Sequence, residues 1–222
     1  MTTGIFRITG LDELGSIYND ILEPSFPPEE LSTRKDFLAA AVEGREQAWV
    51  LFDDDRTAVG VAVVGAYGRP DVRLLSWLAV HPGKRASGMG GRLLASVVSA
   101  LEADGVRLLL GEMEDPCGPA HPTHGDPARR AQFYRRFGAQ VIDVPHESPP
   151  ARPGLDAVPL LLFALPLPSH PLGETVEADA VLDLLCDYRG LKPTSAEYAE
   201  LVACRVDESF AYLPWDSLDI VL

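Results

Sequence analysis

The feature that most constrains this chain is a glycine-rich turn between an apolar stretch and an amphipathic one. Val72–Val80 has the β-branched and apolar content of a buried strand, and His81–Gly83 ends it. Apolar residues then recur at helical spacing at Leu93, Leu94, Val97, Val98 and Leu101. Gly88, Gly90 and Gly91 therefore lie at the start of a helix, where free N–H groups and the helix dipole favour an anion.

The missing side chains of this turn would let a phosphate or pyrophosphate approach the backbone. The alternative is a turn that needs glycine only for its dihedral angles. Two nucleotide motifs are excluded. The turn has no Gly-Lys-Ser/Thr ending, as a P-loop would, and position 93 is leucine where a dinucleotide fingerprint has its third glycine.

The chain is acidic, with a net charge of -14 over 222 residues. This charge disfavours a phosphate backbone as a partner, so no nucleic acid is expected. It suits a cationic substrate such as an amine, although acidic surfaces also serve solubility. The longest apolar run, Val158–Leu167, is broken by two prolines, and the N-terminus lacks a signal-peptide pattern. We therefore expect a cytoplasmic protein without membrane association.

The cysteines and histidines give no strong site. Three cysteines without a C-x-x-C pair predict no disulfide framework and fit a reducing compartment. Cys117, His121 and His124 share one loop, but their spacing matches no standard zinc pattern and a fourth ligand is missing. No metal is expected, and a flexible loop over a site is the preferred interpretation.

Two motifs together resemble a known family. The spacing Arg85-x-x-Gly88-x-Gly90, after a strand that ends at residues 78–82, resembles the acyl-CoA-binding motif of the GNAT N-acetyltransferase superfamily. The segment 131–139, AQFYRRFGA, is similar to the family's helix in which a tyrosine is followed shortly by Phe-Gly. The motifs occur in the family's order and at a plausible separation.

The resemblance implies an α/β fold with a GNAT-like central sheet, mixed but mostly antiparallel. Two parallel strands in that sheet splay apart, and helices flank it. The residue patterns agree with this fold, because they predict antiparallel strands over 47–52, 58–66 and 72–80, a crossover helix, and a parallel strand over 106–112. Further strands are expected at 140–144 and 158–165. Residues 1–166 would form the acyltransferase domain and residues 167–222 a C-terminal helical extension.

The same resemblance implies an acetyl-CoA site. The pyrophosphate would lie in the glycine turn, and the thioester carbonyl would meet a backbone N–H near Leu78 or Ala79. The implied cofactor-binding residues are Leu78, Ala79, Val80, Arg85, Ala86, Ser87, Gly88, Met89, Gly90, Gly91 and Phe133. Tyr134 stands where the family tyrosine donates a proton or a hydrogen bond to the CoA sulfur; the alternative is a half-buried core aromatic.

The catalytic base departs from the family pattern. Some members carry a glutamate on the strand before the glycine turn, but residues 72–80 contain no carboxylate. Glu112 and Glu114, near the carboxyl end of the next parallel strand, are the nearest candidates, acting directly or through water. Attack by free amine without a dedicated base is the other route. Pro127 also replaces the asparagine that many members carry at the start of the tyrosine helix.

The predicted function is transfer of an acetyl or other acyl group from acetyl-CoA to a primary amine of a small molecule or peptide, by direct attack in a ternary complex. Glu23, Glu29 and Glu30 are candidate amine contacts, with ordinary solvated acids as the preferred alternative. A non-catalytic acyl-CoA-binding sensor or regulatory module is the second hypothesis. A third is an interaction protein whose acidic tail serves as a dimer arm, giving a homodimer.

Overall fold

A single large sheet runs through the molecule. The computed structural model describes residues 4–84, 88–122 and 124–218. Within them, nine strands pair in the order β1-β2-β3-β4-β5-β9-β6-β11-β10. Their bounds are β1 Ile5–Ile8, β2 Glu46–Phe52, β3 Ala58–Gly65, β4 Val72–Val80, β5 Leu108–Met113, β6 Gln140–Ile142, β9 Leu161–Leu165, β10 Thr175–Glu177 and β11 Ser209–Leu213. Only β4 and β5 pair in parallel among these described strands, which confirms the predicted mixed sheet.

Six α-helices flank the sheet in the described part of the chain. They are α1 Leu11–Ile17, α2 Arg34–Val42, α3 Met89–Ala103, α4 Pro127–Arg136, α5 Ala178–Arg189 and α6 Ala196–Ala203. A π-helical turn, Tyr18–Leu22, continues α1, and two 3-10 turns cover Pro82–Lys84 and Trp215–Leu218. The predicted helices in both the core and the tail are confirmed.

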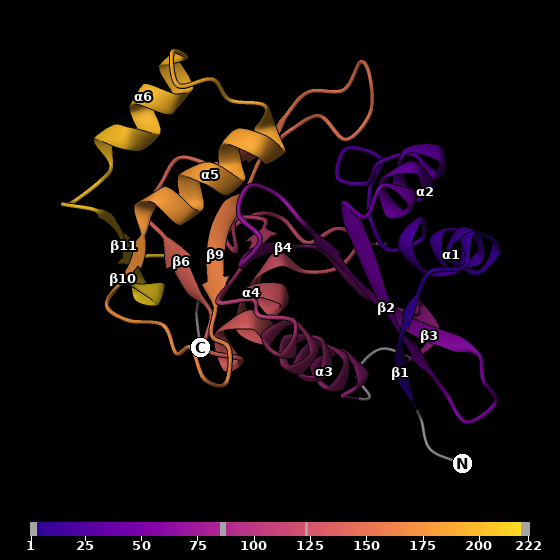
Figure 1. Cartoon of the computed structure of the whole chain (residues 1–222). Helices are drawn as coiled ribbons and strands as arrows, with labels where there is room; N and C mark the ends of the chain where they lie inside the picture. Colours follow the sequence, from indigo (N-terminus) through magenta and orange to yellow (C-terminus); the bar gives the residue numbers. More distant parts are fainter. Residues whose placement is uncertain (1–3, 85–87, 123, 219–222) are drawn as a thin grey trace.

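The helices cover the two faces of the sheet differently (Figure 1). α3 and α4 pack on one face, where Leu93, Leu94 and Val97 join a core with Trp49 and Leu51. The alternate residues of β2 point to the opposite face, under α1 and α2. α5 and α6 cover the other half of that face, over β5, β6 and β9. One face thus has a continuous helical cover, while the other is shared by two separate groups of helices.

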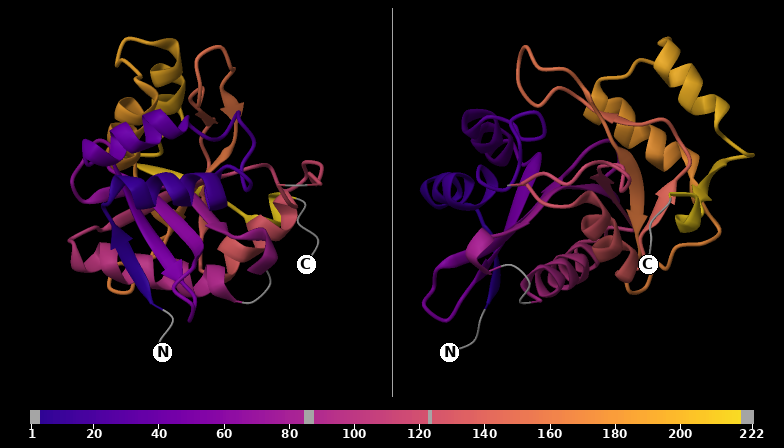
Figure 2. Two further views of the ribbon diagram at one scale, coloured as in Figure 1. Left: turned by 90° about the vertical axis from the view of Figure 1, so that its right-hand side faces the viewer. Right: turned by 180° about the vertical axis from the view of Figure 1, so that it is seen from behind.

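The segment that enters the space between those two groups is an arm formed by residues 145–160. It carries a two-stranded ladder, β7 Glu147–Ser148 with β8 Val158–Pro159. Figure 2 shows the arm, in orange, rising between the N-terminal and C-terminal helices. A single strand over 158–165 was expected. Instead the predicted strand is divided at Leu160 into β8, in the arm, and β9, in the main sheet. Pro159 favours this break, because it has no N–H to donate to a sheet ladder.

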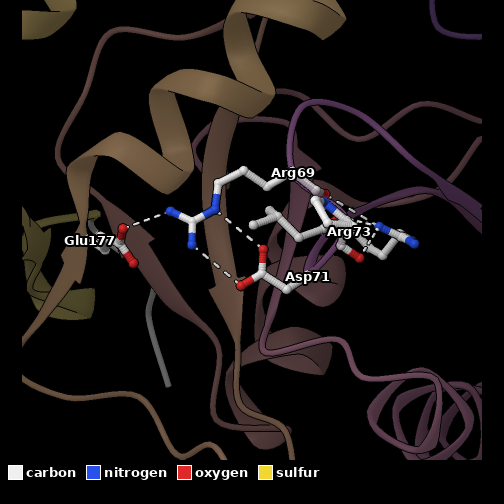
Figure 3. Close-up of polar contacts among 6 residues, drawn as sticks. Arg69, Asp71, Arg73 and Glu177 are labelled. Carbon is white, nitrogen blue, oxygen red and sulfur yellow. Dashed lines mark hydrogen bonds and ion pairs between the residues drawn. The ribbon is translucent and has the colours of Figure 1, made fainter.

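The C-terminal extension is held to the turn between β3 and β4. In Figure 3 the Arg69 guanidinium bridges Asp71 and Glu177, with an Nη1–Oε1 distance of 2.7 Å to Glu177. The Gly68 N–H donates to the Asp187 carboxylate at 2.8 Å. The extension also adds β10 and β11 to the sheet edge beside β6, two strands that the sequence patterns did not predict.

No helix among the described residues is long and apolar enough to cross a membrane.

The docking of the extension depends on the missing side chain of Gly68. This residue has φ +64°, and a Cβ there would lie 2.6 Å from the Asp183 backbone. Gly190, at the end of the same helix α5, has φ +66° and open space around it. We expect Gly190→Ala to lower the free energy of unfolding by about 1 kcal/mol, the cost of a left-handed alanine. Gly68→Ala should lower it by about 2–4 kcal/mol, because α5 must also move.

Denaturant unfolding of both variants measures this difference. Equal losses for the two alanine variants would contradict the close approach of α5 to the turn.

Candidate active site

The site begins where β4 and β5 separate. Their parallel pairing runs only from Val72 opposite Leu108 to Leu75 opposite Gly111. β4 then continues to Val80 against β3 alone. The register of β4 against β3 shifts here, so that Leu75 and Trp77 pair with adjacent β3 residues and Ser76 is the extra residue of a β-bulge. The bulge bends β4 away from β5, and the predicted splayed pair is present.

A cavity of about 330 Å³ opens at this gap. The loop before α2 contributes Glu30, β2 contributes Glu46, and β5 contributes Glu112, with Glu114 just beyond it. Tyr134 reaches the same cavity from α4, which packs on the opposite face of the sheet. The separation of the strands thus allows groups from both faces to meet.

The C-terminal extension and the arm close the cavity from the other side. α5 contributes Asp187 and Tyr188, and the arm contributes residues 148–151. The Tyr188 hydroxyl donates to Glu112 Oε2 at 2.9 Å and lies 2.8 Å from the Ser148 hydroxyl. Residues far apart in the sequence therefore form one wall, and the extension is part of the site rather than a remote appendage.

The cavity carries an excess of negative charge. Six carboxylates line it, against two arginines, Arg45 and Arg130. The carboxylates belong to Glu30, Asp36, Glu46, Glu112, Glu114 and Asp187. A cavity of this composition attracts a cation, because opposite charges interact more strongly away from bulk water. No group of three or more histidine, cysteine, aspartate or glutamate side chains in the described ranges is arranged to hold a metal ion.

The two glutamates predicted as base candidates already have strong partners. Glu112 Oε1 lies 2.6 Å from His146 Nε2, and its Oε2 accepts from Tyr188. Glu114 Oε1 lies 2.6 Å from an Arg130 nitrogen. These bonds fix both carboxylates in place at the mouth of the gap.

Tyr134 is a buried phenol whose proton stays in place at neutral pH. Burial raises its pKa to about 12, while nearby Arg130 lowers it and Glu114 raises it. Its ring packs on Phe163 with centroids 4.5 Å apart and on Phe133 at 5.2 Å. The ring contacts hold the hydroxyl at the cavity, so Tyr134 is placed to donate a proton there.

Two of the carboxylates that line the cavity have a pKa near neutrality. Burial raises the pKa of Glu46 to about 7, although hydroxyl bonds from Tyr67 and Ser76 lower it. Burial also raises the pKa of Glu30 to about 7, with repulsion from Glu114 as the next cause. Glu30 was among the candidate amine contacts, but sequence patterns missed Glu46. Its partners lie 21 and 30 residues away, so only the fold brings them together.

The predicted CoA cradle lies on the α3–α4 face of the same gap. Gly88 caps α3 with φ +75° and has open space around its Cα. A Cβ at Gly90 would touch Phe133 and Val80 at 3.7 Å, so the start of α3 packs on the end of β4 and on α4. Within β4, residues 78–80 pair with β3 and lie beyond the part of the strand that pairs with β5. Arg85, Ala86 and Ser87 lie outside the described residues.

The sequence of residues 44–138 matches a family model described as the acetyltransferase (GNAT) domain. This span contains the glycine turn, both strands of the splayed pair and the tyrosine helix. Over these residues, which are less than half of the chain, the sequence is similar to a GNAT acetyltransferase domain. No curated protein sequence gives a significant match to the chain.

Solved structures show the same fold. One is a protein of Bacteroides thetaiotaomicron assigned to the GNAT acetyltransferase family. It is 24% identical, with a TM-score of 0.59, over 73% of this chain and 86% of that one. Another is the ribosomal-protein-S18-alanine N-acetyltransferase of Escherichia coli, at 19% identity and TM-score 0.53, over 78% and 96%. A third is a Salmonella typhimurium protein solved with its cofactor acetyl-CoA, at 15% and 0.53, over 78% and 98%.

The raised pKa of Glu46 predicts a measurable cost to stability. Between about pH 4.5 and 7 the folded protein holds a proton on Glu46 that the unfolded chain has lost, so stability falls as pH rises through this range. Above pH 7 Glu46 is ionised in both states, so the loss of stability is complete and no longer changes with pH. Glu46→Gln should therefore raise the free energy of unfolding by about 3 kcal/mol at pH 8 but by only about 1 kcal/mol at pH 5.

Denaturant titrations at the two pH values measure the effect. Glu43→Gln, at an exposed carboxylate nearby, is the matched control and should show no such pH dependence. A gain from Glu46→Gln that is the same at pH 5 and pH 8 would contradict the assignment.

Proposed function

We propose that this protein transfers an acetyl group from acetyl-CoA to a primary amine by direct attack in a ternary complex. The observation that carries the proposal is the cavity at the separation of β4 and β5. It brings a protonated phenol from one face of the sheet and a set of carboxylates from the other face to one gap. A phenol suits a departing thiolate, and carboxylates suit an arriving ammonium.

The donor side of the proposal uses the start of α3. Its free N–H groups and dipole would hold the CoA pyrophosphate, with Gly88 to Gly91 allowing close approach. The pantetheine arm would enter the gap along Leu78 and Ala79, which lie beyond the part of β4 that pairs with β5. The acetyl-CoA in the Salmonella typhimurium relative, which shares the fold, supports this choice of donor.

The acceptor side of the proposal uses the acidic cavity. An amine at neutral pH is an ammonium ion, and the excess of carboxylates would concentrate it beside the thioester. Glu112 and Glu114, which their partners hold in fixed positions, would orient the ammonium. The aromatic rings of Phe37 and Trp77 line the same cavity, so an acceptor with an apolar or aromatic body would also fit.

In the proposed reaction the neutral amine attacks the thioester carbonyl carbon and forms the C–N bond. The C–S bond then breaks and its electron pair goes to sulfur. Tyr134 gives its proton to the thiolate and regains one from the nitrogen of the adduct, so the phenol is restored. The products are the amide and CoA with a free thiol.

The proposal is tested by calorimetry of acetyl-CoA binding and by CoA release with tyramine, spermidine, putrescine and an alanine-terminated peptide. We expect acetyl-CoA binding and release that depends on one or more of these amines, with no release for glutamate. Tyr134→Phe should lower kcat by about 10²-fold and leave the acetyl-CoA Kd within about twofold.

Two glycines of α3 supply a matched control for the donor site. Gly88 and Gly105 lie at opposite ends of the helix, with φ +75° and +86° and open space around both. An alanine at either position would have a similar backbone strain, because both have positive φ. Only Gly88→Ala would place a methyl group at the proposed pyrophosphate site. We expect Gly88→Ala to weaken acetyl-CoA binding at least tenfold and Gly105→Ala to leave it unchanged.

Failure to bind acetyl-CoA would overturn the proposal. Binding with no release on any amine would instead favour the acyl-CoA-binding module.

A further inference from the structure

Glu46 is a buried carboxylate at the point where β4 leaves β5. It is only 6% exposed and lines the cavity. Its Oε1 accepts from the Tyr67 hydroxyl at 2.9 Å, and the Ser76 hydroxyl lies 3.2 and 3.3 Å from its two oxygens. Ser76 is the bulge residue that opens the gap. Glu46 is therefore tied to the strand along which the thioester would lie.

Among the described residues no ion pair to this carboxylate is found, although the charge of Arg45 lowers its pKa. The neighbouring Arg45 is more than half exposed, and its guanidinium pairs with Glu43 at 2.6 Å. A buried carboxyl group that is bonded only to two hydroxyl groups lowers the stability of the fold. It must either carry a charge away from water or keep a proton that it would lose in the unfolded chain. Such a cost, at the wall of a cavity, is typical of a residue kept for chemistry rather than for folding.

We propose that Glu46 is the catalytic base that removes the proton from the acceptor ammonium, with Tyr67 and Ser76 as its positioning residues. The inference rests on the proposed acetyl transfer. Glu46, on β2, would take the role of the carboxylate that β4 lacks.

The other carboxylates of the cavity are less suited to this step. Both oxygens of Glu112 are occupied, one by His146 and one by Tyr188. Glu114 Oε1 is held by Arg130 at 2.6 Å. Glu30 lies near that pair, and the Trp77 indole N–H of β4 donates to its backbone carbonyl at 2.9 Å rather than to its carboxylate. Among the described residues of this set, only Glu46 has its carboxylate bonded to a residue of β4.

The groups around Glu46 set a pKa suited to the step. Tyr67, Ser76 and Arg45 lower that pKa and Glu112 raises it, but burial outweighs them and holds it at about 7. A base with this pKa is half ionised at neutral pH, so it can both accept a proton and release it to solvent.

The protons balance in the proposed reaction. The ammonium gives one proton to the Glu46 carboxylate, and the freed lone pair attacks the thioester carbon. A second proton passes from the adduct nitrogen through Tyr134 to sulfur, and the third stays on the amide. Glu46 then loses its proton to solvent, so each turnover releases one proton.

The test is the pH dependence of kcat/KM for CoA release from pH 5.5 to 10, with tyramine and spermidine as probes at saturating acetyl-CoA. Wild-type kcat/KM should rise about tenfold per pH unit up to about pH 7. Glu46→Gln should lower it about 10²-fold at pH 7.5 and remove the plateau above pH 7, so that kcat/KM keeps rising with the fraction of neutral amine. The deficit should shrink toward pH 10, because an amine that is already neutral needs no base.

Tyr67→Phe gives a readout that a purely structural Glu46 would not move. Loss of the hydroxyl bond should raise the pKa of Glu46, so the rise in kcat/KM should shift to higher pH with its plateau nearly unchanged. Glu30→Gln is the matched control and should keep the rise at its wild-type pH, whereas Glu112→Gln should shift it to lower pH, because Glu112 raises the pKa of Glu46.

Carbon-13 NMR of glutamate-labelled protein separates this inference from the proposed function, because it needs no acceptor. Two glutamates, Glu30 and Glu46, should titrate near pH 7, and only one of the two signals should disappear in Glu46→Gln. A break in the pH profile near pH 7 that survives Glu46→Gln, or that Glu30→Gln removes, would overturn the assignment of Glu46 while leaving acetyl transfer intact. Absence of acetyl-CoA binding would instead overturn the proposed function.

Discussion

The end of the parallel pairing between β4 and β5 is the constraint on which the rest of the structure depends. A parallel pair normally continues along both strands, because each backbone group that is removed from water needs a partner. Here the bulge at Ser76 turns β4 away after Leu75, and β5 continues to Met113 without it. The sheet stays intact through β3 on one side and β9 on the other. The result is a gap between β4 and β5 within a sheet whose strands are otherwise paired side by side.

This opening makes the two faces of the sheet act together. α3 and α4 supply the glycine turn and Tyr134 from one face. The carboxylates approach from the other, between the N-terminal helices and α5. That second face is covered by two separate groups of helices, so a cavity remains between them. The C-terminal extension narrows the cavity through Tyr188, and Gly68 and Arg69 hold the extension in place.

Local patterns predicted the parts of this arrangement that depend on neighbouring residues. The hairpin of β2 and β3, the strand-turn-helix of β4 and α3, and the left-handed Gly105 follow from periodicity and turn chemistry. Asp126 caps α4, with its side chain accepting from the Ala128 N–H. The tyrosine helix and the glycine turn were enough to indicate the fold family before any contact was known.

The features that depend on contacts between distant residues could not be predicted from local sequence patterns. β10 and β11 are short strands of three and five residues; β10 pairs with β11, and β11 pairs with β6, which lies about 70 residues earlier in the chain. Glu46 looks like an ordinary acid at the start of an apolar strand. Its burial and its bonds to Tyr67 and Ser76 exist only once β2, β3 and β4 are assembled. The same holds for Glu112, whose partners come from the arm and from α5.

The most direct measurement is a crystal structure of the protein with acetyl-CoA bound. The account predicts the pyrophosphate at the start of α3, the pantetheine arm between β4 and β5, and the sulfur within hydrogen-bonding distance of the Tyr134 hydroxyl. The thioester carbon should face the cavity on the side of Glu46. Acetyl-CoA bound outside the gap, or a thioester turned away from the carboxylates, would contradict the account.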